Sequence, residues 1–213
     1  MRVTEKLVAA SLLALMAGCS SWNPFASKDP KVEPAKLVEL KSSIAVRDAW
    51  KYSIGKAGVY AFTPALAGGS LYVVNADGAL ARLDAASGRE TWRIKAGSDI
   101  TSSAGSDGTV VAVGAAKGAV LAFDADGKQL WKAQASSEVL TPPVVGQGVV
   151  VVRSVDNRIV GFDAKTGERK WTVQRATPAL TLRNAPGMVL GGTNVYVAER
   201  GGQLRALMDA TGV

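Results

Sequence analysis

The sequence contains no histidine and only one cysteine among its 213 residues. Without histidine the chain has no Ser–His–Asp or Cys–His catalytic arrangement, no histidine-ligated metal site and no histidine proton shuttle. A single cysteine allows neither an internal disulfide nor a cysteine-rich zinc site. The composition therefore excludes several large classes of enzyme and metalloprotein for the sequence in view.

Long hydrophobic runs and clustered charges are also scarce. The longest nearly continuous apolar run, Leu7–Met16, is much shorter than the roughly 20 residues that a membrane-spanning helix needs. The 25 lysines and arginines outnumber the 18 acidic residues and give a formal charge of +7, but they are dispersed along the chain. We therefore expect a mixed-charge surface and no nucleic-acid partner.

The chain does have enough apolar sequence for a packed core and many glycines for turns. Hydrophobic residues make up 47% and charged residues 20% of the chain, which is the composition of a globular protein. The 23 glycines against 8 prolines favour an all-β fold with many tight turns.

Residues 1–18 have the pattern of a bacterial lipoprotein signal peptide. Arg2 and Lys6 precede the apolar run Leu7–Met16, and small residues then lead to Cys19. This order resembles the lipobox of bacterial lipoproteins, in which the cysteine is acylated and the chain is cut before it. The alternative is an ordinary signal peptide with an incidental cysteine. Lipidation gives a reason for a lone cysteine in an exported protein, so we expect Cys19 to be lipidated.

Residues 19–40 are expected to comprise the acylated cysteine and a flexible, proline-interrupted tether. Ser20, directly after the cysteine, resembles the signal for delivery to the outer membrane. We therefore expect the protein to be lipid-anchored on the periplasmic face of the outer membrane and not threaded through it.

An aspartate and a tryptophan each recur at intervals of 39 or 40 residues. The aspartate opens a short motif of the form Asp-Ala-x-Ser/Thr-Gly, of which the middle copy is one residue shorter, and the tryptophan follows seven or eight residues after the aspartate. We expect each aspartate to accept hydrogen bonds from the turn and each tryptophan to fill the gap between neighbouring units. The three full copies contain Asp84 and Trp92, Asp124 and Trp131, and Asp163 and Trp171.

Each unit of about forty residues resolves into four short strands, which is typical of a β-propeller blade. We therefore predict an all-β fold, a β-propeller of four-stranded antiparallel blades over residues 41–213, with about four blades and a further strand near Trp50. The predicted repeats are 50–97, 98–136, 137–175 and 176–213. Within them, the first strands are expected near Phe62–Leu66, Thr101–Gly105, Leu140–Val144 and Ala185–Val189, and the second strands at Leu71–Asn75, Val110–Val113, Val149–Val152 and Asn194–Ala198.

The repeat resembles the PQQ-type propeller repeat, which two families share. Quinoprotein dehydrogenases bind pyrroloquinoline quinone with Ca²⁺ and commonly contain a disulfide between adjacent cysteines. The BamB family consists of non-catalytic lipoproteins of the outer-membrane β-barrel assembly (BAM) complex, with eight blades. The lipobox and the absence of a Cys–Cys pair make this sequence more similar to BamB, so the resemblance implies a scaffold without a cofactor.

A local match strengthens the resemblance to the BamB family. Leu180, Leu182 and Arg183 lie in a Leu-x-Leu-Arg segment followed by Ala-Pro. In that family these residues face the POTRA domains of the partner BamA, so the resemblance implies the same role here, beside other BAM components. Direct binding of unfolded outer-membrane proteins through an exposed strand edge is a second role that the sequence leaves open.

The spacing of the repeat singles out the same segment. Trp92 to Ala104 and Trp131 to Pro143 each span 12 residues, whereas Trp171 to Pro186 spans 15. A loop that departs from the repeat and carries two leucines and an arginine is a candidate interaction surface. In the alternative interpretation, both leucines pack into the core between blades and Arg183 is solvated.

Two further expectations concern the rest of the molecule. A quinoprotein dehydrogenase remains the alternative function, although the visible acidic residues mostly occupy turns and show no metal-ligand spacing. A fourth motif begins at Asp209, and the sequence stops before its tryptophan. We therefore expect the sequence to be the N-terminal half of a longer protein.

Overall fold

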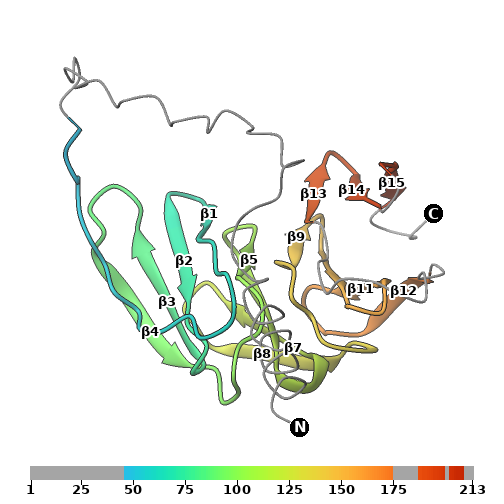
Figure 1. Cartoon of the computed structure of the whole chain (residues 1–213), viewed down its shortest axis with the longest axis horizontal. Coiled ribbons are helices and arrows are strands. Elements are labelled where there is room, and N and C mark those ends of the chain that lie inside the picture. The colour runs from blue at the N-terminus through green and yellow to red at the C-terminus, as the bar shows by residue number, and fades with distance from the viewer. Residues whose placement is uncertain (1–45, 175–186, 200–201, 209–213) are drawn as a thin grey trace, which may run out of the picture. The chain divides into compact units, whose positions relative to one another are not determined.

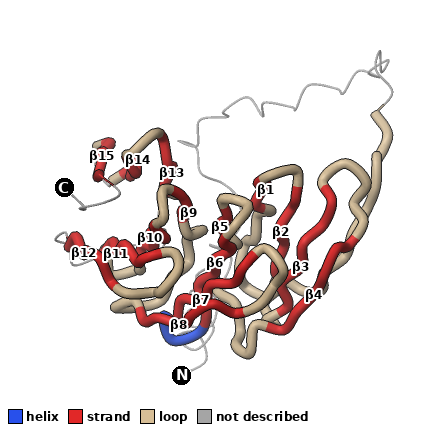
Figure 2. The backbone as a smooth tube through the Cα atoms, turned by 180° about the vertical axis from the view of Figure 1, so that it is seen from behind, coloured by secondary structure: helices blue, strands red, loops and turns tan. Residues whose placement is uncertain are grey.

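The computed structural model describes residues 46–174, 187–199 and 202–208, and these form antiparallel β-sheets (Figures 1 and 2). Among these residues one 3-10 turn, η1 (Ala116–Gly118), lies between strands. Within the described ranges, no helix has the length and apolar character needed to cross a membrane. The strands are β1 (Ala65–Ala67), β2 (Ser70–Val74), β3 (Ala79–Asp84), β4 (Glu90–Lys95), β5 (Gly105–Ser106), β6 (Val110–Ala115), β7 (Ala119–Asp124), β8 (Gln129–Gln134), β9 (Val144–Gly146), β10 (Val149–Arg153), β11 (Arg158–Asp163), β12 (Arg169–Gln174), β13 (Met188–Gly191), β14 (Asn194–Ala198) and β15 (Leu204–Met208).

Every sheet is a simple meander in which each strand pairs with the next one along the chain. The first three sheets have four strands each, in the orders β1-β2-β3-β4, β5-β6-β7-β8 and β9-β10-β11-β12. The fourth sheet has three strands among the described residues, in the order β13-β14-β15. This arrangement confirms the predicted all-β fold built from four-stranded antiparallel blades.

The second strands begin within one residue of their predicted positions, whereas the first strands begin three or four residues later than predicted. Thr101, for example, lies before β5 and is held by single hydrogen bonds to two different segments. Its backbone N–H donates to the Gly114 carbonyl at 2.9 Å, and its hydroxyl donates to the Val139 carbonyl at 2.7 Å. Because these two bonds satisfy the N–H and the hydroxyl of Thr101, the residue remains buried without belonging to a strand.

The prediction of a strand near Trp50 is wrong for the described residues, because no strand is assigned before β1. Residues 47–58 nevertheless lie against the first sheet. The Asn75 side chain donates to the Ile54 carbonyl at 2.9 Å, and the Ala76 backbone donates to the Lys56 carbonyl at 3.1 Å. The segment is therefore docked by isolated hydrogen bonds, without the strand neighbour that a β-ladder requires.

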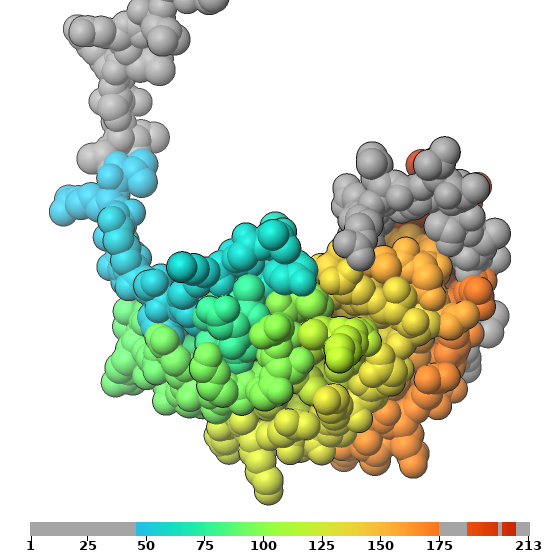
Figure 3. All heavy atoms as spheres, turned by 60° about the horizontal axis from the view of Figure 1, so that its bottom comes forward, coloured from blue at the N-terminus to red at the C-terminus, as the bar shows by residue number. Residues whose placement is uncertain are grey.

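Adjacent sheets pack face to face, and the alternation of side chains along the middle strands divides the core between them. On β6, Val111 and Val113 face the first sheet, while Val110 and Ala112 face the third. A strand buried on both faces reads as a continuous apolar run, which is why β6 and β10 are almost wholly apolar. Atoms of the first three sheets accordingly form one continuous body (Figure 3).

The repeated tryptophan of one sheet lies on a turn glycine of the next. Trp131 on β8 packs in the cluster between the second and third sheets, and its indole N–H donates to the Ala164 carbonyl at 2.9 Å. A Cβ atom on Gly167 would lie only 2.6 Å from the Trp131 ring, and Gly167 has a φ of +75°. The turn therefore requires glycine for both its backbone conformation and the approach of the ring.

The same contact recurs along the chain. Trp92 lies on Gly127 and donates to the Ala125 carbonyl at 2.8 Å. Trp50, from the docked segment, lies on Gly88 of the first sheet. The recurrence explains why tryptophan and glycine repeat together in the sequence.

We predict that Trp131→Ala lowers the free energy of unfolding by about 3–5 kcal/mol, because a large buried ring is lost from the junction between two sheets. Chemical denaturation followed by far-ultraviolet circular dichroism measures this change. Leu130→Ala, at a neighbouring side chain that is 41% exposed, is the control and should cost less than about 1 kcal/mol. Equal losses in the two variants would contradict the role of the tryptophan.

Candidate interaction surface

The predicted partner-binding residues fall in the connection between the third and fourth sheets. Leu180, Leu182 and Arg183 lie outside the described residues, as does Cys19. The structure places the two ends of this connection, at Gln174 on β12 and at Met188 on β13.

This connection is the longest between successive described sheets. Nine residues separate β4 from β5, and nine separate β8 from β9, whereas thirteen separate β12 from β13. This connection is four residues longer than the other two, and it contains the segment after Trp171 in which the sequence spacing also lengthens.

Both ends of the connection are fixed by core packing. Trp171 on β12 and Met188 on β13 are each 8% exposed and belong to one apolar cluster between the third and fourth sheets. Ile159 and Val195 lie in the same cluster. The described strands on both sides of the connection are therefore held by core packing.

Arg153 links the third and fourth sheets and was not predicted as a site residue. It is 2% exposed, and its guanidinium donates to the Ala198 carbonyl on β14 at 2.9 Å and to the Asn157 side chain at 3.1 Å. The only sign of this role in the sequence is that a charged residue directly follows the apolar run Val149–Val152. The other sheets have an apolar residue or glycine at the corresponding position.

We predict that Arg153→Ala lowers the free energy of unfolding by about 1–3 kcal/mol, because it removes the hydrogen bonds that a buried guanidinium donates to Asn157 and Ala198. Amide hydrogen exchange should also become faster in β14, which Arg153 contacts. Arg158→Ala, which removes a half-buried guanidinium bonded to the Gln174 side chain at 2.8 Å, is the control. Unchanged exchange in β14 would show that Arg153 does not hold the fourth sheet.

The repeated aspartates organise the turns that receive the tryptophans. Asp84 accepts from the Ser87 hydroxyl at 2.6 Å and from the Ser87 backbone N–H at 2.8 Å. Asp163 accepts from the backbone N–H groups of Lys165 and Thr166 at 2.9 and 3.0 Å. Asp124 accepts in the same way from Asp126 and Lys128. These contacts close the turn beside each inter-sheet junction.

The same hydrogen bonds change the acidity of two of these carboxyl groups. The Ser87 hydroxyl and backbone N–H lower the pKa of Asp84. The backbone N–H groups of Thr166 and Lys165 lower the pKa of Asp163. Both groups favour the folded state in their ionised form, so their contribution to stability is present above the pKa of an unfolded aspartate, about 3.9.

We predict that this contribution is lost as the pH falls below about 4, through the lowered folded-state pKa values. The Asp84→Asn/Asp163→Asn variant should therefore be less stable than the wild type at neutral pH and should lose less stability between neutral and strongly acidic pH. Thermal melts over that range measure the difference, with Asp126→Asn in an exposed part of the neighbouring turn as the control. Parallel stability curves for the variant and the wild type would contradict the prediction.

A cluster of side chains that the sequence did not predict holds residues 47–58 on the first sheet. The Tyr52 hydroxyl donates to the Glu90 carboxylate, and Arg93 donates to the Tyr52 hydroxyl at 2.8 Å and to Glu90 at 3.0 Å. The Arg93 guanidinium also lies 5.4 Å from the centroid of the Tyr52 ring. Burial raises the pKa of Tyr52, and the hydrogen bond from Tyr52 lowers that of Glu90. No sequence motif links residues so far apart, so only their meeting in space shows the cluster.

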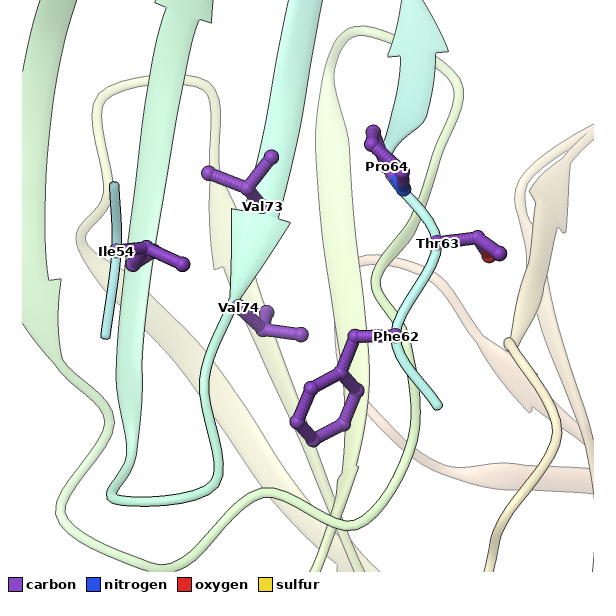
Figure 4. A pocket seen from close by; sticks show the side chains of 6 residues that line it. All are labelled: Ile54, Phe62, Thr63, Pro64, Val73 and Val74. Atoms are coloured by element: carbon purple, nitrogen blue, oxygen red, sulfur yellow. The ribbon is translucent and has the colours of Figure 1, made fainter. Parts of the chain in front are cut away.

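A small hollow lies beside the same segment. It has a volume of about 120 Å³ and is lined by Ile54, by residues 62–64 and by Val73 and Val74. Figure 4 shows Phe62 and Val74 pointing toward one another across it. The lining carries no titratable side chain, so the hollow offers apolar contact and no acid–base chemistry.

The acidic residues that a quinone and Ca²⁺ site would draw on are engaged in turns. Asp107 accepts from the backbone N–H groups of Thr109 and Val110 at 2.8 and 2.9 Å, and Asp156 accepts from the Ser136 hydroxyl at 3.0 Å. In the part of the chain that the structure describes, no three His, Cys, Asp or Glu side chains gather as a metal site would require.

Comparison with known proteins points to one family. A family model described as outer membrane protein assembly factor BamB matches residues 44–103 and 95–213. The BamB of Bordetella pertussis is 45% identical over 206 residues, which cover 97% of this chain and 52% of that protein. The chain spans about half the length of the curated relatives it matches.

Solved structures show the same fold in proteins with different names. The crystal structure of BamB from Moraxella catarrhalis matches with a TM-score of 0.64 and 22% identity, over 71% of this chain and 46% of that one. A quinohemoprotein alcohol dehydrogenase from Pseudomonas putida HK5 matches with a TM-score of 0.59 and 17% identity, over 77% of this chain and 34% of that one. At these identities the similarity concerns the fold alone.

Proposed function

Because the chain belongs to the BamB family of outer-membrane protein assembly factors, we propose that it is a non-catalytic scaffold of the β-barrel assembly complex. The family model covers nearly all of the region predicted to form the propeller, and this is the observation that carries the proposal. In this role the protein assists the folding and insertion of outer-membrane proteins and needs no cofactor.

The proposed docking surface for BamA is the connection between β12 and β13. It contains Leu180, Leu182 and Arg183, which match the family segment that faces the POTRA domains. Two observations support this choice: the connection is longer than those between the other described sheets, and both of its ends are anchored in the core through Trp171 and Met188. A loop with a fixed base presents the same side chains to the partner each time, which lowers the entropy lost on binding.

The chemistry of the segment fits a modest protein interface. An arginine supplies several donors for carboxylates or carbonyls of the partner, and leucines supply apolar area. A lipid on Cys19 would confine the scaffold and an outer-membrane partner to the same surface, which raises their effective concentration. A small contact area is then sufficient for a stable complex.

The lipid anchor also defines the proposed location, the periplasmic face of the outer membrane. There the scaffold would meet the other components of the complex as well as BamA. Contact with unfolded outer-membrane proteins, through strand edges such as that of β4 or β8, is compatible with the same location.

We predict that Arg183→Glu weakens co-purification with BamA by about tenfold or more, as expected for reversing a charge at an interface hot spot. Pull-down of BamA from solubilised membranes measures the effect. Arg169→Glu is the matched control, because it makes the same charge change at an exposed position on β12 and should leave binding unchanged.

A further variant separates binding from folding. Leu182→Ala should also reduce BamA binding while leaving the melting temperature close to that of the wild type. If Arg183→Glu and Leu182→Ala bind BamA normally, the docking surface lies elsewhere. If Leu182→Ala instead unfolds the protein, the leucine belongs to the core, as in the alternative interpretation of the sequence.

We predict that Cys19→Ala abolishes incorporation of labelled palmitate and releases the protein from the outer-membrane fraction. The reason is that one anchor, not a spanning segment, is proposed to hold the protein there. Ser21→Ala, two residues after the cysteine, is the control and should remain acylated. Retention of Cys19→Ala in the outer membrane after a high-salt wash would contradict the anchor.

A further inference from the structure

The connection that leads into β1 is longer than the corresponding connections into β5 and β9. In each of the first three sheets, the turn between the second and third strands donates a backbone hydrogen bond to the connection before the first strand. The accepting carbonyls belong to Lys56, Asp99 and Glu138, and the donors are Ala76, Ala116 and Val155, at 3.1, 2.9 and 2.9 Å. Eight residues separate Lys56 from β1, whereas five separate Asp99 from β5 and five separate Glu138 from β9. The three additional residues belong to a turn at residues 57–60, here called the inserted turn.

The inserted turn is seated on the first sheet. It is closed by a hydrogen bond from the Tyr60 N–H to the Ala57 carbonyl at 3.2 Å, and Gly58 has a φ of +64°. A Cβ atom on Gly58 would lie 3.3 Å from the Cβ of Ala76, so the turn rests on the loop between β2 and β3. The Tyr60 ring lies 5.8 Å from the ring of Phe62, which packs against the core between the first and second sheets. The first sheet therefore fixes the position of the turn.

The inserted turn presents an apolar side chain beside a positive charge. Val59 is 93% exposed, and Lys56 is exposed three residues before it. Lys56 takes the place of Asp99 and Glu138 in the shared contact with the next turn. Residues 97–99 read Gly-Ser-Asp and residues 136–138 read Ser-Ser-Glu. The longer connection is therefore apolar and basic where the two shorter connections are polar and acidic.

The connection between β12 and β13 combines the same two features. It is also longer than its counterparts, and its sequence contains two leucines and Arg183. It starts from the same end of the sheets. Lys95 at the end of β4 pairs with the first residue of β3, and Gln174 at the end of β12 pairs with the first residue of β11. The fourth strands therefore end beside the turns between second and third strands, where the inserted turn also lies.

We propose that the inserted turn is a second docking element for BamA, and this inference rests on the proposed function. Its chemistry fits an apolar recess of the partner bordered by carboxylates, with Val59 in the recess and Lys56 at its border. Sheets are stacked about 10 Å apart, so about 20–30 Å separates the inserted turn from the start of the connection after β12. A partner with several domains, such as the POTRA domains, spans this distance. Two such contacts bind more tightly than either alone.

The path of the preceding segment favours a protein over the membrane surface as the occupant. Trp50 lies on Gly88 in the turn between β3 and β4, whereas the Lys56 carbonyl meets the turn between β2 and β3. Between these points the segment runs beside β4 (Figure 1), where the Tyr52 hydroxyl donates to Glu90. The chain from Cys19 therefore joins the first sheet at the end opposite to the inserted turn.

Co-purification of BamA with variants of the lipidated protein, in cells whose complex is intact, tests the proposal. Val59→Asp should lower BamA recovery by about threefold or more, because it places a charge in an apolar contact. Val46→Asp is the matched control, since it makes the same change at a side chain that is 91% exposed and lies outside the inserted turn. A photoreactive residue at position 59 should also form an adduct with BamA, independently of any substitution that alters charge.

The outcomes separate this inference from the proposed function. Normal BamA recovery with Val59→Asp, or no BamA adduct from position 59, would overturn the second docking element while Arg183→Glu still tests the first. Loss of BamA from the wild-type pull-down would overturn both. Flotation of the Cys19→Ser protein with vesicles of phosphatidylethanolamine and phosphatidylglycerol tests the membrane as occupant. Vesicle binding that Val59→Asp abolishes would assign the turn to the membrane and contradict the proposal.

Discussion

The fold depends on one recurring contact, the tryptophan of one sheet lying on a turn glycine of the next. The contact needs three features at once: a ring, a residue without a side chain, and a carbonyl that accepts the indole N–H, as Trp131, Gly167 and Ala164 provide. Each sheet is apolar on both faces and cannot be stable alone in water. The repeated contact therefore makes the stability of every sheet depend on its neighbours.

A molecule built in this way has few places where it can differ from its own repeat. Most of each unit is committed to packing, and the repeated aspartates are committed to turns by the hydrogen bonds that Asp84 and Asp163 accept. The thirteen-residue connection between β12 and β13 is longer than the connections between the other described sheets. Such a fold suits a scaffold, because a rigid repeat fixes the position of the one segment that is free to specialise.

Much of this architecture could be predicted from the sequence, because the repeat appears directly in it. The spacing of Trp92, Trp131 and Trp171 identifies the sheets, and runs of residues that favour β-structure identify their second strands. The first strands were misplaced because residues such as Thr101 are held by single hydrogen bonds to two different segments and not by a strand ladder. Arg153 and the cluster of Tyr52, Glu90 and Arg93 were missed for another reason. Their partners lie on other segments, and one sequence contains no information on such pairing.

We propose that the repeat presents the connection after β12 to BamA. Site-specific photo-crosslinking in living cells tests it most directly, with the photoreactive residue at position 182 and, as the control, at the exposed position 91 on β4. We expect an adduct with BamA from position 182 and none from position 91. An adduct from position 91 alone, or none from position 182 in cells whose complex is intact, would contradict it.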